Sequence, residues 1–310
     1  MLSRTAEHLF WLARYIERAE STARLIEMGQ RMAMLPGAGA RDEWRSVVMA
    51  AGAATHFAAD ERITETTAVR ALLLDPANPS SIRACLAQAR ANGKAVRTAL
   101  TREMWEAMND GWRRLETVED GASLRRELPE LLDWTRGRAT LFRGAAEAGM
   151  LRNDGWDFLR MGGFVERADM VLRLLDVKYY VLLPETEVVG GGRDHHQWTS
   201  VLHATSASRA YHHVYRGDYT PWKIADFLIL NRAFPRSLIH CYRETGRHLD
   251  RLARRYGKRH ACHTTANVMI ARLEDAGMGE LFRDGLHEFI GEAIRVNGRL
   301  SAEISRAYHF

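Results

Sequence analysis

A motif that occurs twice places the strongest constraint on how this chain folds. Residues 9–25 read LFWLARYIERAESTARL and residues 158–174 read FLRMGGFVERADMVLRL, so both contain Glu-Arg-Ala and a later Arg-Leu, 149 residues apart. Residues 44–47 resemble 198–201, and residues 79–85 resemble 235–241, at offsets of 154 and 156. Three matches in the same order at nearly constant spacing indicate the duplication of a unit about half the chain long.

The duplication predicts how the chain is organised. We expect one domain over residues 1–310, with an internal repeat of roughly 1–150 and 151–310. Two halves that carry the same apolar faces pack most simply around a pseudo-twofold axis.

The local sequence pattern predicts helices. Only 7 of the 310 residues are proline, and no segment alternates apolar and polar residues as a strand does. Asn78-Pro79 and Phe234-Pro235 place proline at an expected first helical position, where its missing N–H costs nothing. We therefore predict an all-α, bundle-like fold.

Composition limits the compartment and the partners. The net charge is +5, with 44 basic and 39 acidic residues largely interspersed, so a nucleic-acid partner is not indicated. The three cysteines, Cys85, Cys241 and Cys262, contain no Cys-x-x-Cys pair and predict neither a disulfide framework nor a thiolate metal site. No run approaches the ~20 apolar residues of a membrane span, and the charged start is unlike a signal peptide. We expect a cytoplasmic protein.

The two Glu-Arg segments place charges on helices that are apolar on almost every side. Such helices are buried. At about 100° per residue, Glu17, Glu20 and Arg24 share one strip, and Glu166, Asp169 and Arg173 repeat it. One interpretation is that Glu17–Arg24 and Glu166–Arg173 are internal ion pairs that fix how the halves dock. The other is that both strips line a common polar cleft for a charged substrate.

Two glycines precede the second Glu-Arg by one turn. Glycine inside a helix costs ~1 kcal/mol relative to alanine. Gly162 and Gly163 therefore suggest either a close backbone approach or open space beside the acid, and open space would make the second site the roomier one.

These residues resemble the alpha-E family, bacterial helical proteins named for a Glu-Arg motif. The resemblance covers essentially the whole chain. It rests on residues 11–20, 78–82, 89–90, 96–97, 103–109, 164–169, 226–228 and 235–237. The chain departs from the family at residues 91–94, where relatives tend to have an acidic residue and a second arginine.

The resemblance implies a genomic setting. Relatives are often fused to, or encoded beside, a circularly permuted ATP-grasp protein, commonly with a transglutaminase-like protein nearby. ATP-grasp enzymes activate a carboxylate as an acyl phosphate for attack by an amine. The expected function is a helical subunit of an ATP-grasp-associated, amide-bond-forming system that modifies a peptide. This chain is expected to bind no cofactor of its own, with ATP and Mg²⁺ acting through the partner.

The family pattern also implies site residues. By this pattern, the catalytic candidates are Glu17, Arg18, Glu166 and Arg167. The candidates for substrate binding are the further family positions and the rest of the two charged strips: Arg14, Glu20, Arg24, Arg90, Arg97, Glu103, Asn109, Asp169 and Arg173.

Two other functions stay open. One is a stand-alone enzyme, a hydrolase or an amide or amino-group transfer catalyst, with Glu17 or Glu166 as general base. The other is a non-catalytic scaffold with buried ion pairs. No Glu-x-x-His pair for a di-metal bundle occurs, and no metal site is predicted. The most basic stretch, residues 243–260, is expected to be a solvated helix face.

Overall fold

The computed structural model describes residues 3–34, 40–58, 60–180, 192–275, 277–283 and 285–310. Within these ranges the chain is helical and contains no strand, which confirms the all-α prediction. The elements are α1 (Ser3–Ala33), α2 (Ala40–Ala50), η1 (Ala54–His56), α3 (Glu65–Leu73), α4 (Ile82–Ala95), η2 (Arg97–Ala99), α5 (Arg102–Glu116), α6 (Ala122–Gly149), α7 (Asp154–Tyr180), α8 (Gly192–Ala204), α9 (Ser208–Tyr215), α10 (Pro221–Leu230), α11 (Leu238–Tyr256), α12 (Ala261–Asp275), α13 (Met278–Arg283) and α14 (Leu286–Tyr308).

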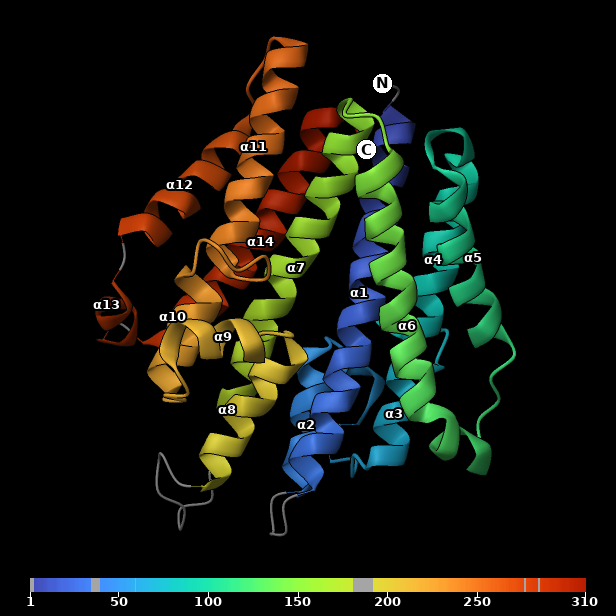
Figure 1. The fold of residues 1–310 in the computed structure, drawn as a ribbon, viewed down its shortest axis with the longest axis vertical. Helices are drawn as coiled ribbons and strands as arrows, with labels where there is room; N and C mark the ends of the chain where they lie inside the picture. Colours follow the sequence, from blue (N-terminus) through green and yellow to red (C-terminus); the bar gives the residue numbers. More distant parts are fainter. Residues whose placement is uncertain (1–2, 35–39, 59, 181–191, 276, 284) are drawn as a thin grey trace.

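Helices α1 and α7 lie side by side in the middle of the molecule (Figure 1). On one side, α4 and α6 pack against α1, and α5 packs outside them; on the other side, α11 and α14 pack against α7, and α12 packs outside them. Helices α2 and α8 each contact both central helices. The two Glu-Arg segments thus lie on the two innermost helices.

Burial of α1 follows from its sequence. Leu9, Phe10, Leu12 and Leu25 are all completely inaccessible to solvent although they point in different directions around the helix. Full burial of such side chains stabilises a fold by about 1.5–3 kcal/mol each. The prediction that this helix is buried is confirmed, and its charged residues must therefore find partners inside the protein.

The starts of α4 and α11 differ from the expectation. Pro79 and Pro235 were expected at the first helical position, but both lie in turns before the helices begin. The N-caps are instead Ser81, whose Oγ accepts the Ala84 N–H at 3.1 Å, and Ser237, whose Oγ accepts the His240 N–H at 3.2 Å. A serine hydroxyl satisfies a free amide of the first turn, and this fixes where the helix starts.

The two adjacent glycines of α7 serve opposite purposes. A Cβ on Gly162 would lie 2.1 Å from the carbonyl oxygen of Phe10, so this glycine permits close contact between the α1 and α7 backbones. A Cβ on Gly163 would meet no atom within 4 Å. Both features suggested by the sequence are present, each at a different glycine.

Candidate functional site

The two Glu-Arg motifs exchange partners across the contact between α1 and α7. Glu17 accepts hydrogen bonds from Nε and Nη2 of Arg167, at 2.8 and 2.9 Å. Glu166 accepts hydrogen bonds from Nε and Nη2 of Arg18, at 2.5 and 3.0 Å. Each glutamate therefore binds the arginine of the other motif through two parallel bonds, the strongest geometry for this pair.

The ion pairs expected within each strip, Glu17–Arg24 and Glu166–Arg173, are wrong. Arg24 instead pairs with Glu20 at 2.6 Å, and Arg173 pairs with Asp169 at 2.6 Å. Residues seven apart lie about 10 Å apart along a helix, whereas residues four apart are neighbours on its surface.

The Glu166 cluster, formed by Arg14, Arg18 and Glu166, is compact. Nε of Arg14 donates to Glu166 at 2.7 Å, and its Nη1 donates to Ser301 of α14 at 2.6 Å. Burial alone would raise the pKa of the Glu166 carboxyl, but Arg18 and Arg14 outweigh it and lower the pKa to about 2. The carboxylate is 2% exposed and both of its oxygens are occupied.

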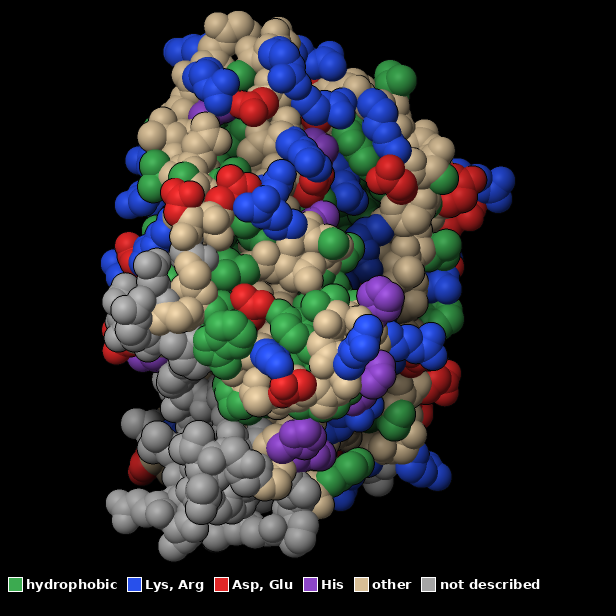
Figure 2. Space-filling model, turned by 60° about the vertical axis from the view of Figure 1, so that its left-hand side comes forward, with side chains coloured by type: hydrophobic (Ala, Val, Ile, Leu, Met, Phe, Trp, Pro, Cys, Tyr) green, Lys and Arg blue, Asp and Glu red, His purple; other side chains and the backbone are tan. Residues whose placement is uncertain are grey.

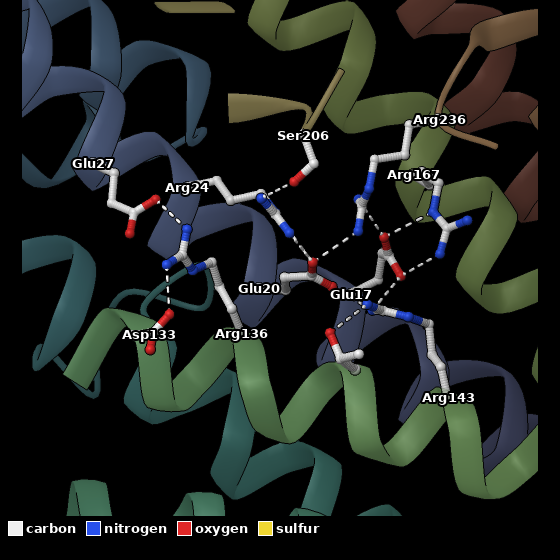
Figure 3. A network of polar contacts seen from close by, with 11 residues as sticks. Glu17, Glu20, Arg24, Glu27, Asp133, Arg136, Arg143, Arg167, Ser206 and Arg236 are labelled. Carbon is white, nitrogen blue, oxygen red and sulfur yellow. Dashed lines mark hydrogen bonds and ion pairs between the residues drawn. The ribbon is translucent and has the colours of Figure 1, made fainter. Parts of the chain in front are cut away.

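The Glu17 cluster is larger and richer in positive charge (Figure 3). Its two carboxylates, Glu17 and Glu20, are buried and are surrounded by arginines from four parts of the chain. These are Arg24 of α1, Arg143 of α6, Arg167 of α7 and Arg236 in the turn before α11.

Arg143 and Arg236 each bridge both carboxylates. Arg236 lies 3.0 Å from Glu17 and 2.7 Å from Glu20, and Arg143 lies 3.1 Å from Glu17 and also pairs with Glu20. Burial alone would raise the pKa of Glu17, but the surrounding arginines, led by Arg167, hold it well below its usual value. Four guanidinium groups thus surround two ionised carboxylates, which leaves an excess of positive charge.

A pocket opens beside this excess charge. Its volume is about 30 Å³, which is room for about two water molecules or a single carboxylate group. Apolar side chains of α1, α6 and α7 form most of its wall. Its other lining residues are Glu17, Arg143, Arg160, Gly163 and Arg167.

Arg160 contributes a cation on which the carboxylates of Glu147, Glu17 and Glu244 act only at a distance. Its guanidinium lies 4.7 Å from the centre of the Phe164 ring, and it forms no ion pair with any residue in the described ranges. Burial, followed by the nearby positive charge of Arg167, lowers its pKa. The Glu17 cluster and this pocket together form the candidate site, and a negatively charged group is the ligand that fits it.

Sequence analysis missed three of the arginines at this site: Arg143, Arg160 and Arg236. Arg236 falls within a segment that matches between the two halves and could have been chosen on that ground. Arg160 falls within the repeated segment 158–174, but its counterpart there is Trp11, so the match does not single it out. Arg143 carries no such signal, because α6 reaches the site only through tertiary packing.

The remaining predicted residues lie elsewhere, and no ion pair between described residues joins them to either cluster. Arg90 donates to Asn109 at 2.9 Å and stacks on Trp112, and Arg97 lies over the Trp105 ring. Glu103 is exposed in the first turn of α5, where hydrogen bonds at the helix start, from its own backbone amide and from Thr101, lower its pKa.

Two buried cysteines accompany the clusters. Cys85 lies near Arg18 and Glu166, and Cys241 lies near Arg167 and Glu17. Both are completely buried, and burial raises the pKa of each thiol to about 12. Both are small residues of the core, and neither has the thiolate character of a nucleophile.

In the described part of the chain, no three His, Cys, Asp or Glu side chains are grouped to hold a metal ion. None of the helices searched there has both the length and the apolar character of a membrane span. The end of the molecule near α11 is rich in Lys and Arg, with Asp and Glu between them (Figure 2).

Comparison with family models identifies the chain. The Alpha-E model, described as a predicted alpha-helical domain with a conserved ER motif, matches residues 1–309. The chain belongs to the Alpha-E family. In this Alpha-E protein, Glu17-Arg18 and Glu166-Arg167 are the two ER pairs that meet at the centre of the fold. Comparisons with curated proteins and with solved structures found no match.

Proposed function

We propose that this Alpha-E protein is a helical binding subunit of an ATP-grasp-dependent, amide-bond-forming system. In this proposal it holds the acceptor, an amino acid or peptide, through a carboxylate in the pocket beside Glu17, while the acceptor's amine stays free to react. The ATP-grasp partner would bind ATP and Mg²⁺ and supply the acyl phosphate. A transglutaminase-like protein is the second partner in this proposal.

The observation that carries the proposal is the excess of positive charge at a pocket with apolar walls. Arg160 has no counterion among the described residues, and Arg143 and Arg167 share the carboxylate of Glu17. A ligand carboxylate at this point would supply the missing negative charge. The small volume admits the carboxylate itself, so the rest of the ligand would lie across the opening.

The geometry favours binding over general-base catalysis by the ER glutamates. A general base needs a free lone pair and a pKa near the working pH. Glu17 and Glu166 each accept hydrogen bonds from at least two arginines, and the pKa of each is held well below the usual value. We therefore assign Glu17 and Glu166 to fastening α1 to α7 and to positioning the arginines.

We also infer that the fold arose by internal duplication around a pseudo-twofold axis. The reciprocal ER pairs support this inference, since each motif plays the same part towards the other. The packing order supports it too, because α4 and α6 flank α1 as α11 and α14 flank α7.

We assign the protein to the cytoplasm, where three free, buried thiols stay reduced.

The binding role is tested by titrating the purified protein with a short peptide that has a free C-terminal carboxylate. The same peptide with an amidated C-terminus is the control ligand. We expect binding of the free acid alone, and we expect Gly163→Leu, which fills the pocket, and Arg160→Gln to abolish it. Gly144→Leu on the exposed side of α6 is the matched control. Equal binding of both peptides would contradict the proposal.

The partner is tested separately by affinity purification of the tagged protein from its native bacterium. Stoichiometric recovery of an ATP-grasp protein, by wild type and by Gly163→Leu alike, is the expected result. ATP turnover by the recovered complex should then depend on an acceptor and be lost in the Gly163→Leu complex. Recovery of no ATP-grasp protein would contradict this part of the proposal.

A further inference from the structure

A second cationic pocket lies further along α1, next to the Glu17 cluster, with which it shares Arg24. Its volume is about 390 Å³, within the range of about 300–1,000 Å³ typical of small-molecule sites. Side chains of α1, α6, α8, α9 and the α8–α9 turn line it. The polar ones are Arg24, Glu27, Arg31, Arg136, His203, Ser206, Ser208 and Arg209.

The charges around this pocket do not balance. Arg24 is paired with Glu20, and Arg136 bridges Glu27 and Asp133 at 2.7 Å each (Figure 3). Arg31 and Arg209 form no ion pair with any residue that the structure describes. Four guanidinium groups therefore face a pocket that contains one carboxylate of its own.

The turn between α8 and α9 adds hydroxyl groups at the same place. Ser206 has φ = 56°, the left-handed conformation that usually selects glycine after a helix. Its N–H donates to His203, and the next N–H, of Ala207, donates to Leu202, which closes α8. A side chain in this conformation costs roughly 1–2 kcal/mol. Arg24 donates a 2.6 Å hydrogen bond to the Oγ of Ser206 and holds the serine in this conformation. The turn therefore places a hydroxyl group at the pocket, which a glycine would lack.

The start of α9 faces the pocket without an acidic residue. Ser208 and Arg209, in the first turn of this helix, line the pocket. The N-cap residue Ala207 provides no side-chain cap, and no acidic residue occurs in the first turn. The positive charge of an arginine in the first turn is repelled by the positive end of the helix dipole. An anion bound in the pocket would offset this repulsion.

We propose that this pocket binds the phosphate group of a small phosphorylated molecule. A carboxylate carries one negative charge, which is too little for the two guanidinium groups, of Arg31 and Arg209, that hold no described ion pair. A phosphate offers at least three strong acceptor oxygens and up to two negative charges. This inference does not depend on the carboxylate pocket beside Glu17, which shares no lining residue with it.

The test is calorimetric titration with inorganic phosphate at fixed ionic strength. The variant is Arg31→Gln/Arg209→Gln, which removes two exposed cations that hold no described ion pair. The control is Arg254→Gln/Arg255→Gln, which removes the same charge from an exposed part of α11. We expect saturable binding by wild type and control, and affinity weakened by about tenfold or more in the pocket variant.

The proposal fails if wild type does not bind phosphate, if the control loses as much affinity as the pocket variant, or if succinate binds as tightly as phosphate. Circular dichroism checks that the double variant is folded. If it is not, the single variant Arg209→Gln is measured, and an unchanged affinity there overturns the proposal.

Discussion

The same ER pair is used twice in this protein, with different results. Around Glu166, both arginines come from α1, the cluster is compact, and Arg14 fills the space beside the carboxylate. Around Glu17 and Glu20, four arginines converge from separate parts of the chain. Gly163, the counterpart of Arg14 in the second motif, has no side chain and leaves a pocket. Both pairs therefore join α1 to α7, and the pair at Glu17 also borders the pocket that we propose as a ligand site.

The largest effects should come from neutralising the two glutamates. Glu17→Gln would remove the carboxylate that pairs with Arg167 and leave Arg143 and Arg236 with Glu20 alone, and we expect a loss of about 3–5 kcal/mol in the free energy of unfolding. Glu166→Gln should cost less, because only two arginines, Arg14 and Arg18, lose a partner there, whereas three lose one at Glu17. Urea unfolding measures both. A larger loss for Glu166→Gln would show that the two clusters are not as different as we describe.

Acid should weaken the Glu166 cluster over a defined pH range. The folded-state pKa of Glu166 is about 2, below the ordinary value of 4.5. Its contribution is therefore fully present above pH 4.5 and is lost as the pH falls towards 2. The lost stability is roughly 3 kcal/mol. Between pH 6 and pH 2 the free energy of unfolding should fall less steeply in Glu166→Gln than in wild type. Equal slopes would argue against the lowered pKa of Glu166.

The adjacent glycines offer a sharper comparison. Gly162→Ala should destabilise the protein by about 1–3 kcal/mol, because its Cβ meets the Phe10 carbonyl and α1 and α7 must separate. Gly163→Ala should be neutral or stabilising by up to ~1 kcal/mol, since its Cβ enters open space and alanine favours the helix. Thermal unfolding of the two variants gives the answer directly. Equal effects would mean that the pocket at Gly163 is closed in solution.

The smallest expected effect concerns the arginines that differ between the clusters. Arg14→Gln removes an ion pair to Glu166 and a hydrogen bond to Ser301, and should cost about 1–3 kcal/mol. Arg160→Gln removes a cation with no described counterion, and stability should change by no more than ~0.5 kcal/mol. The comparison uses urea midpoints under identical conditions. A substantial loss for Arg160→Gln would show that its charge has a structural partner and is not reserved for a ligand.

Much of the fold was predictable. The apolar surface around residues 9–25 predicted a buried helix, and the match at residues 158–174 predicted a second, and these are the two central helices. Gly162 and Gly163 were recognised as unusual because a helix interior rarely tolerates glycine without a reason. The helix starts at Ser81 and Ser237 were misplaced because proline suggested an earlier position than the serine cap that decides it.

The candidate site was only partly predictable. Glu17, Arg18, Glu166 and Arg167 were chosen from the family pattern as catalytic candidates, and the structure brings them together. The ion pairs predicted within each strip, Glu17–Arg24 and Glu166–Arg173, were wrong, because spacing along one helix says nothing about partners on another. The outlying candidates Arg90, Arg97, Glu103 and Asn109 were carried over from a family pattern and have local partners of their own.

The sequence by itself determined that this chain is helical, that two of its helices are buried, and that both carry charges needing partners inside the protein. These properties depend on periodicity and residue type, which are local. Tertiary structure alone decided that the motifs exchange arginines, that Arg143 and Arg236 also pair with Glu17, and that Arg160 forms no ion pair in the described part of the chain. Those outcomes depend on which helices approach one another, and charge balance in a protein interior is set by neighbours in space rather than by neighbours in the chain.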